Sequence, residues 1–200
     1  MNRLLTAAAL AGTLALAACG GSAEETASSP ETHASGHSGS AAASADFNDA
    51  DVSFATGMRP HHAQAIVMSD LVLATDPPAE VAELARQIKA AQDPEIAQLD
   101  EMLVTFGSPP AGAGHEMHGG GHMGMLSDEQ MAELRAAKGN DAARLFLQGM
   151  IAHHEGAIEA SETELAEGRY EPAKELARSI AESQAAEIET MKQMLEKLPA

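Results

Sequence analysis

The sequence predicts an all-α fold, an antiparallel four-helix bundle built from two tandem helical hairpins. Aromatic residues are only 2% of the chain while hydrophobic residues are 44%, so Ala, Leu, Ile and Met must form the core. Ala, Leu and Met favour helices, and small side chains let helices pack closely. The chain also repeats itself: Met58 and His61 return as Met150 and His153, and both pairs differ by 92 positions. Two hairpins with apolar faces must bury those faces against each other with pseudo-two-fold symmetry.

The first 18 residues are expected to be a signal peptide. Arg3 precedes an apolar run over 4–18, and residues 16–19 (Leu-Ala-Ala-Cys) resemble the signal of bacterial lipoproteins. Cleavage at such a signal leaves the cysteine first, so Cys19 is the expected lipid anchor. We therefore expect an exported, membrane-anchored lipoprotein, periplasmic or at the cell surface, that contacts the membrane by its lipid only. An ordinary secretory signal followed by a coincidental cysteine is the alternative.

Residues 19–45 are rich in Ser, Ala and Gly, and we expect them to form a disordered tether. The bundle domain is expected at 46–200. Within it, a linker at 107–126 separates a hairpin at 46–106 from a hairpin at 127–200. Two chains that exchange hairpins to form a homodimer would satisfy the same pattern.

Apolar periodicity predicts five helices, at about 49–74, 78–105, 128–138, 141–167 and 171–197. Helix-start signals are Asp76-Pro77 as N-cap and first helical residue, Ser127 with Gln130 at capping-box spacing, and Pro172. The expected C-terminal glycines are Gly107 and Gly168.

The formal net charge of −18 makes nucleic acid a poor partner, because a polyanion would be repelled. An acidic surface suits cations better, although solubility alone also accounts for such a charge.

Methionine and histidine recur on one face of the first and third long helices. Met58, His61 and Met68 are spaced three and seven residues apart and fall on one stripe, with His62 beside it. The second half repeats the motif as Met150, His153 and His154. A single core histidine or a methionine stripe is usually only packing. The duplicated Met-x-x-His-His motif favours a binding site, because buried imidazoles are costly unless something binds them.

The donor types favour copper, as Cu(I). Thioether sulfur combined with imidazole selects Cu(I), whereas carboxylates would select iron, manganese or calcium. Di-iron bundles carry Glu three residues before His, and here those positions hold Met58 and Met150. Thioether is a poor ligand for zinc.

The two partner helices carry polar residues at core spacing. Gln92 and Glu95 in one, and Gln184 and Glu187 in the other, are predicted to orient the imidazoles, with each glutamine level with the first histidine of its motif. A structural role in fixing helix register is the alternative. The same helices offer further candidate metal ligands, namely Met102, Met191 and Met194.

The linker holds a dense set of soft and imidazole donors: His115, Met117, His118, His122, Met123 and Met125. Short His-rich tracts commonly bind metal, so these residues are predicted to form a flexible copper-collecting arm. An unstructured linker without a role is the alternative.

The Met-Arg-Pro-His-His motif at 58–62 and the Met-Ile-Ala-His-His-Glu-Gly-Ala-Ile motif at 150–158 resemble those of a bacterial family. This is the exported, ferritin-like domain-of-unknown-function family numbered three hundred and five, and the likeness covers roughly 46–198. It implies a four-helix bundle and, from its copper-binding and copper-resistance members, copper ligands at the motif positions. The family often has a methionine later in the second motif, where this chain has Ala160, so two equal sites are not expected.

These observations together predict a copper-binding protein that sequesters copper, confers tolerance or delivers the metal. A protein that donates or accepts copper would be its partner. No catalytic constellation is recognised, so an enzyme is not expected. The alternatives are a ferritin-like metal oxidase and a metal-free helical interaction module.

Overall fold

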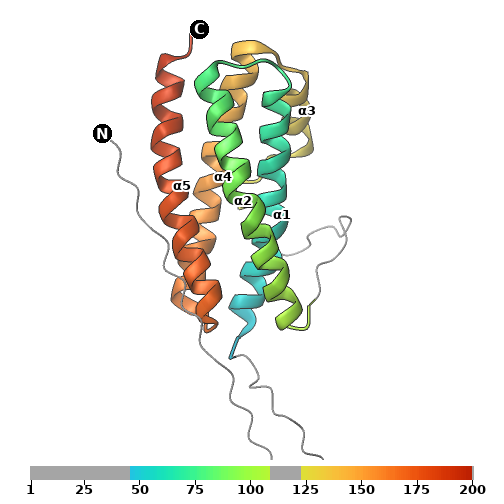
Figure 1. The fold of residues 1–200 in the computed structure, drawn as a ribbon, viewed down its shortest axis with the longest axis vertical. Coiled ribbons are helices and arrows are strands. Elements are labelled where there is room, and N and C mark those ends of the chain that lie inside the picture. The colour runs from blue at the N-terminus through green and yellow to red at the C-terminus, as the bar shows by residue number, and fades with distance from the viewer. Residues whose placement is uncertain (1–45, 109–122, 200) are drawn as a thin grey trace, which may run out of the picture. The chain divides into compact units, whose positions relative to one another are not determined.

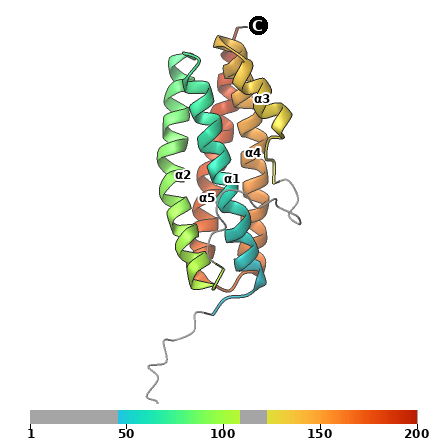
Figure 2. The same ribbon diagram turned by 90° about the vertical axis from the view of Figure 1, so that its right-hand side faces the viewer.

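The computed structural model describes residues 46–108 and 123–199. Within these ranges it contains five helices: α1 (Asp49–Leu73), α2 (Ala79–Thr105), α3 (Asp128–Ala136), α4 (Gly139–Glu167) and α5 (Glu171–Lys197). The four long helices lie side by side as a bundle, and the short α3 lies against α1 and α4 (Figures 1 and 2). The prediction of an all-α four-helix bundle is confirmed. The signal peptide, Cys19, the tether and residues 109–122 of the linker lie outside the described residues.

The two hairpins are α1 with α2 and α4 with α5, and they join chiefly through α1 and α4. These two helices run antiparallel, since the side-chain amide of Asn48 before α1 donates to the carbonyl of Glu167 at the end of α4, at 2.8 Å. This arrangement brings the two copies of the Met-x-x-His-His motif face to face. In the described part of the chain, no helix is long and apolar enough to cross a membrane.

Several helix ends follow the predicted signals. Ser127 and Gln130 form a capping box at the start of α3, and Pro172 lies in the first turn of α5. Gly107 follows α2 with a φ of 70°, the left-handed conformation expected of a C-terminal glycine.

One predicted helix start is wrong, and one predicted C-terminal glycine ends its helix in an unexpected conformation. Pro78, not Asp76, is the N-cap of α2, because a residue that precedes a proline is pushed out of the helical region and Pro77 precedes Pro78. Gly168 ends α4 in extended backbone and not in the left-handed region. The small residue is needed there for space, since a Cβ on Gly168 would lie 2.2 Å from Oε1 of Glu164.

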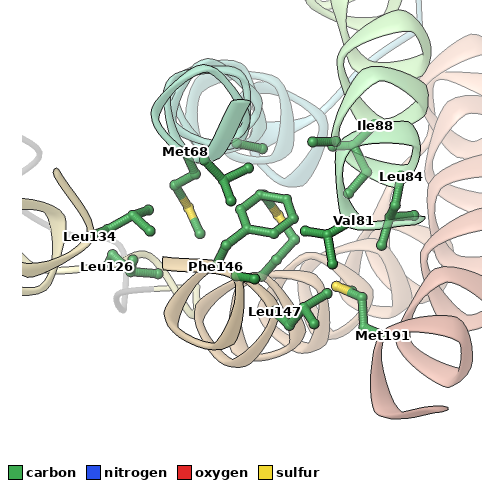
Figure 3. Close-up of a cluster of buried hydrophobic side chains, with 14 of the residues drawn as sticks. Met68, Val81, Leu84, Ile88, Leu126, Leu134, Phe146, Leu147 and Met191 are labelled. Carbon is green, nitrogen blue, oxygen red and sulfur yellow. The ribbon is translucent and has the colours of Figure 1, made fainter. Parts of the chain in front are cut away.

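The buried side chains form two clusters, one toward each end of the bundle. The Met68 cluster contains Met68, Val81, Leu84, Ile88, Leu126, Leu134, Phe146, Leu147, Met150 and Met191 among its buried members. Figure 3 shows these side chains converging around Phe146 from α1, α2, α4 and α5. The Met58 cluster contains Phe54, Met58, Leu99, Met102, Leu103, Phe106, Leu176 and Ile180 among its buried members. The histidine motifs lie between the two clusters along α1 and α4.

Candidate metal centre

Four histidines form a row across the middle of the bundle. The rings of His61 on α1 and His153 on α4 stack with centroids 3.5 Å apart and planes inclined by 30°. His62 and His154 flank this pair, with ring centroids 6.2 Å from His61 and 6.3 Å from His153 respectively. All four side chains are fully buried. We call these four residues the histidine row.

Carboxylates from the partner helices hold the outer rings. Nε2 of His62 donates to Oε2 of Glu95 on α2 at 2.8 Å, and Nε2 of His154 donates to Oε2 of Glu187 on α5 at 2.6 Å. In a neutral imidazole one nitrogen donates and the other carries a lone pair. The glutamates therefore leave Nδ1 of each outer ring as the lone-pair nitrogen, the arrangement found behind metal-binding histidines.

The inner rings are held differently. Nε2 of His61 donates to the backbone carbonyl of Met123 at 2.8 Å, which leaves its Nδ1 as the lone-pair nitrogen. His153 has no hydrogen-bond partner for either ring nitrogen among the described residues. The row thus has four buried Nδ1 atoms without a partner in the described part of the chain. Buried polar atoms are nearly always paired, so this group of orphaned nitrogens points to a ligand.

Burial keeps the inner imidazoles neutral. It lowers the pKa of His61 to about 4, against the opposing effect of the hydrogen bond to Met123. Burial also holds the pKa of His153 well below its usual range, and the neighbouring His61 adds to the effect. Neutral rings stack without charge repulsion and keep their lone pairs for a metal at neutral pH. Because those lone pairs lie in the ring planes, an ion would bind at the edge of the stack.

The predicted orienting residues divide into two kinds. Glu95 and Glu187 contact the outer rings, one helical turn beyond the positions that the sequence placed level with the first histidines. Gln92 and Gln184 are buried, but no hydrogen bond joins either amide to a described residue. The predicted orienting contact is therefore made by both glutamates. Among the described residues, neither glutamine makes it.

The motif methionines lie at opposite ends of the histidine row. Met58, Met68 and Met150 are fully buried. Met68 and Met150 share the Met68 cluster, and the Met68 methyl lies 3.3 Å from where a Cβ on Gly149 would be. Met58 belongs to the other cluster. Antiparallel α1 and α4 explain this, since Met68 after one histidine pair and Met150 before the other then lie on the same side of the stacked rings.

The remaining candidates are scattered. Met102 is buried in the Met58 cluster, while Met191 is buried and Met194 partly buried in the Met68 cluster. Figure 3 shows Met191 on α5 beside Val81 and Leu147. The candidates of the arm that lie outside the described residues are His115, Met117, His118 and His122. A metal role for all of these stays a prediction.

Carboxylates and imidazoles alone do not make a metal site here. Within residues 46–108 and 123–199, no three His, Cys, Asp or Glu side chains are grouped so that they could hold one ion. The other buried donors on these helices are the thioethers of the motif methionines and the unpaired amides of Gln92 and Gln184. The centre therefore suits a soft ion that accepts few ligands, and not a hard cation that needs several oxygen atoms.

Residues 123–126, which we call the strap, are the main feature that the sequence did not predict. The arm was expected to be flexible to Met125, yet its end is packed against α1 and α4. The side-chain amide of Gln64 holds the strap with two hydrogen bonds, accepting from the Leu126 amide at 2.8 Å and donating to its carbonyl at 2.9 Å. Glycines inside helices mark close backbone approach, so Gly57, Gly149 and Gly156 were the available signal.

A buried carboxyl pair was also missed. Asp51 at the start of α1 and Glu164 near the end of α4 are fully buried. The repeat offset offered a signal, because the positions equivalent to Asp51 and Glu164 hold the apolar residues Ala143 and Val72. An acid at a core position in only one half of the repeat indicates a contact that the other half does not make.

Comparison with known proteins agrees with this geometry. A Deinococcus radiodurans DUF305 fragment is 33% identical with a TM-score of 0.68, and the match covers 76% of this chain and 98% of that one. A DUF305 protein from Streptomyces coelicolor, described as secreted, is 32% identical with a TM-score of 0.67 over 74% of this chain and 93% of that one. CopM in its Cu(I)-bound form is 27% identical with a TM-score of 0.63, over 75% and 98% of the two chains.

CopM is also known in Cu(II)-bound and Ag-bound forms. No curated protein matches the chain. The family described as Domain of unknown function (DUF305) matches residues 51–195, which is most of the chain. The resemblance drawn from the two motifs is confirmed, and this chain belongs to that family.

Proposed function

We propose that this protein is an exported copper-binding protein that holds Cu(I) between the histidine row and the buried methionines. The observation that carries the proposal is the set of four buried Nδ1 atoms without a partner in the described part of the chain. Fixed imidazole lone pairs beside thioether sulfur form a donor set that selects Cu(I).

The relatives support the choice of metal. CopM has been solved with Cu(I), Cu(II) and Ag, and its identity to this chain is 27–30% across those structures. Silver and Cu(I) are both soft monovalent ions, so one donor set can serve both. The secreted description of the Streptomyces relative supports export. The lipid anchor at Cys19 and a periplasmic or cell-surface location complete the proposal.

Sequestration, tolerance or delivery fits the site better than catalysis. Each ring of the histidine row is fully buried, which favours retention of the ion over turnover of a substrate. Ferritin-like oxidases place Glu three residues before His, and here those residues are Met58 and Met150. The protein is therefore proposed to bind copper without being an enzyme.

The test is an anaerobic Cu(I) titration against a competing chelator, with Zn(II) as the comparison metal. The double variant Met58→Leu and Met150→Leu keeps core volume nearly constant and removes one thioether at each end of the row. We expect its Cu(I) affinity to fall at least about tenfold, which is about 1.4 kcal/mol. Met131→Leu on α3 is the matched control and should bind like the unchanged protein. Equal affinity for Zn(II), or an unchanged Cu(I) affinity in the double variant, would overturn the proposed donor set. Absence of tight Cu(I) binding in the unaltered protein would favour a metal-free helical module.

A further inference from the structure

The two ends of the histidine row are not equivalent. The repeat offset pairs Met68 with Ala160, so the second motif lacks the later methionine of the first. Because α1 and α4 are antiparallel, that loss falls at the opposite end from Met68. One end has two buried thioethers, from Met68 and Met150. At the other end Ala160 packs, partly buried, against the cluster that contains Met58.

Met123 of the strap lies where the missing thioether would be needed. It packs, partly buried, against the Met58 cluster, as Ala160 does. Its Sδ lies 3.2 Å from the position of a Cβ on Gly57, the residue before Met58. The same residue also contacts the histidine row, since its carbonyl accepts from Nε2 of His61 at 2.8 Å. Met123 thus places its sulfur at the Met58 end of the histidine row and also holds the His61 ring by its carbonyl.

The strap is built to hold Met123 there. A Cβ on Gly156 would lie 2.0 Å from the Met123 carbonyl, and one on Gly124 would lie 1.9 Å from the carbonyl of Ala152. Both glycines are therefore required by the close approach of strap and α4. Gly156 is the repeat equivalent of Gln64, which clamps the strap from α1. The two equivalent positions therefore both hold the strap. Gly156 on α4 leaves space for it, and Gln64 on α1 forms hydrogen bonds to it.

The backbone of Met123 supports a role for its side chain. Its φ is 34°, in the left-handed region that glycine and asparagine adopt more readily than methionine. Residues held in such conformations cluster at ligand-binding sites, where the surroundings determine them. A side chain of this size kept at a strained position, with its sulfur beside Gly57, indicates a use for that sulfur.

We propose that Met123 is a thioether ligand that the strap supplies to the Met58 end of the histidine row, in place of the methionine lost at Ala160. This rests on the proposed function and deepens it. Met123 also lines a cleft of about 610 Å³ between α1 and α4, together with the acidic residues Asp49, Glu159 and Glu167. Met123 therefore borders both the buried cluster and an acidic cleft through which a cation can approach.

The experiment compares three forms of the protein: Met123→Leu, the control Met131→Leu on α3, and Met123→Leu combined with Ala160→Met. Each is titrated with Cu(I) under anaerobic conditions against a competing chelator. X-ray absorption of the loaded protein then gives the mean number of sulfur neighbours per copper. Leucine conserves volume, so the sulfur count reports ligation and not packing.

Met123→Leu should weaken Cu(I) binding at least tenfold, since even residues behind a ligand change affinity by roughly 10- to 100-fold. It should also lower the sulfur count, while Met131→Leu changes neither. Adding Ala160→Met should restore both values. An unchanged sulfur count and affinity in Met123→Leu would overturn this inference and leave the proposed function standing. Failure of the unaltered protein to bind Cu(I) would instead overturn the proposed function, and this inference with it.

Discussion

At the scale of single residues, the centre depends on which nitrogen of each imidazole carries the proton. Glu95 and Glu187 settle this for His62 and His154 by accepting from Nε2. The two contacts repeat across the halves of the chain, since each joins residues 33 positions apart. The carboxylates lie partly exposed while the rings are fully buried. They therefore connect a buried ligand to the solvent-facing edge of the bundle.

Replacement of Glu95 and Glu187 by Gln should weaken Cu(I) binding. The amide keeps the shape of the side chain but accepts more weakly, and it can turn its own donor toward the ring and so favour the other tautomer. We expect a loss of roughly 10- to 100-fold in affinity in the double variant, with helix content unchanged. Competitive Cu(I) titration measures the affinity and circular dichroism the helix content.

The control is Glu101→Gln, an exposed glutamate on α2 away from the row. Its affinity should equal that of the unaltered protein. If the double variant also binds Cu(I) normally, the glutamates serve the packing of α2 and α5, and the outer histidines are not ligands.

The sequence predicted the histidines and methionines of the centre but not how they pair. His61 and His62 are adjacent on a helix, so their rings point about 100° apart, and periodicity alone does not say which ring meets α2. The choice depends on the rotation of each helix in the assembled core. Gln92 was placed level with His61 on spacing alone, whereas the contact forms from Glu95 to His62. The strap contact to His61 depends on a tertiary approach that the helix glycines mark, without indicating which segment approaches them.

At the scale of helices, the buried carboxyl pair joins three chain segments. Asp51 in the first turn of α1 accepts from the amides of Arg169 at 3.0 Å and Tyr170 at 2.8 Å, between α4 and α5. It also accepts from the amide of Asn48 at 2.6 Å in the capping box of α1. Burial pushes the pKa of Asp51 up, but these amides outweigh it and the net pKa is lowered. Asp51 is therefore ionised.

Glu164 is the neutral member of this pair. Burial first, and then the neighbouring Asp51 carboxylate, raise its pKa to about 8. At neutral pH Glu164 carries a proton and can donate it to Asp51. The folded state thus binds a proton that the unfolded chain, with a glutamate pKa near 4.5, releases.

This pair predicts a loss of stability as pH rises. A raised pKa in the folded state contributes stability that is fully present below about 4.5 and is lost as pH rises through about 8. Between pH 6.5 and 8.5, the free energy of unfolding of the metal-free protein should fall by at most about 1.4 kcal/mol per pH unit from this group. The pKa of His61 and that of His153 are lowered on folding, so these groups act in the opposite sense until the free imidazole, with a pKa of 6.5, has lost its proton. The fall due to Glu164 is therefore clearest between pH 7.5 and 8.5.

Glu164→Gln should flatten that dependence, because the amide can donate to Asp51 without titrating. Chemical denaturation at pH 6.5, 7.5 and 8.5 measures it, with the exposed α4 residue Glu159→Gln as the matched control. Equal slopes for Glu164→Gln and the unaltered protein would show that Glu164 is already ionised at pH 6.5.

Helix positions were largely predictable, and the errors have local causes. Periodic apolar residues located all five helices to within two residues at each end. The predicted caps differ from the observed ones at two helix ends, where a neighbouring proline or a tertiary contact determines the backbone conformation. Pro77 and Pro78 delay the start of α2, and Glu164 takes the space that a side chain at Gly168 would fill.

At the scale of the whole molecule, the repeat determines both the fold and the place of the centre. Each hairpin has one apolar face, and the two faces can be buried only against each other. The sequence predicted this packing of the two faces. It places the ring of His61 in the first hairpin against the ring of His153 in the second. A ligand at this contact joins the two halves of the chain.

Copper should therefore stabilise the whole bundle, because unfolding separates the hairpins and releases the ion. With free Cu(I) at 1,000 times its Kd, binding to the folded state alone adds about 4.1 kcal/mol and raises Tm by roughly 10 °C. Anaerobic thermal denaturation followed by circular dichroism measures the rise. A variant with Ala at His115, His118 and His122 is the control and should keep the rise, since the proposed site at the contact between α1 and α4 is unchanged in it. Tight Cu(I) binding with no rise in Tm would place the ion on that arm or equally on the unfolded chain, away from the contact between α1 and α4.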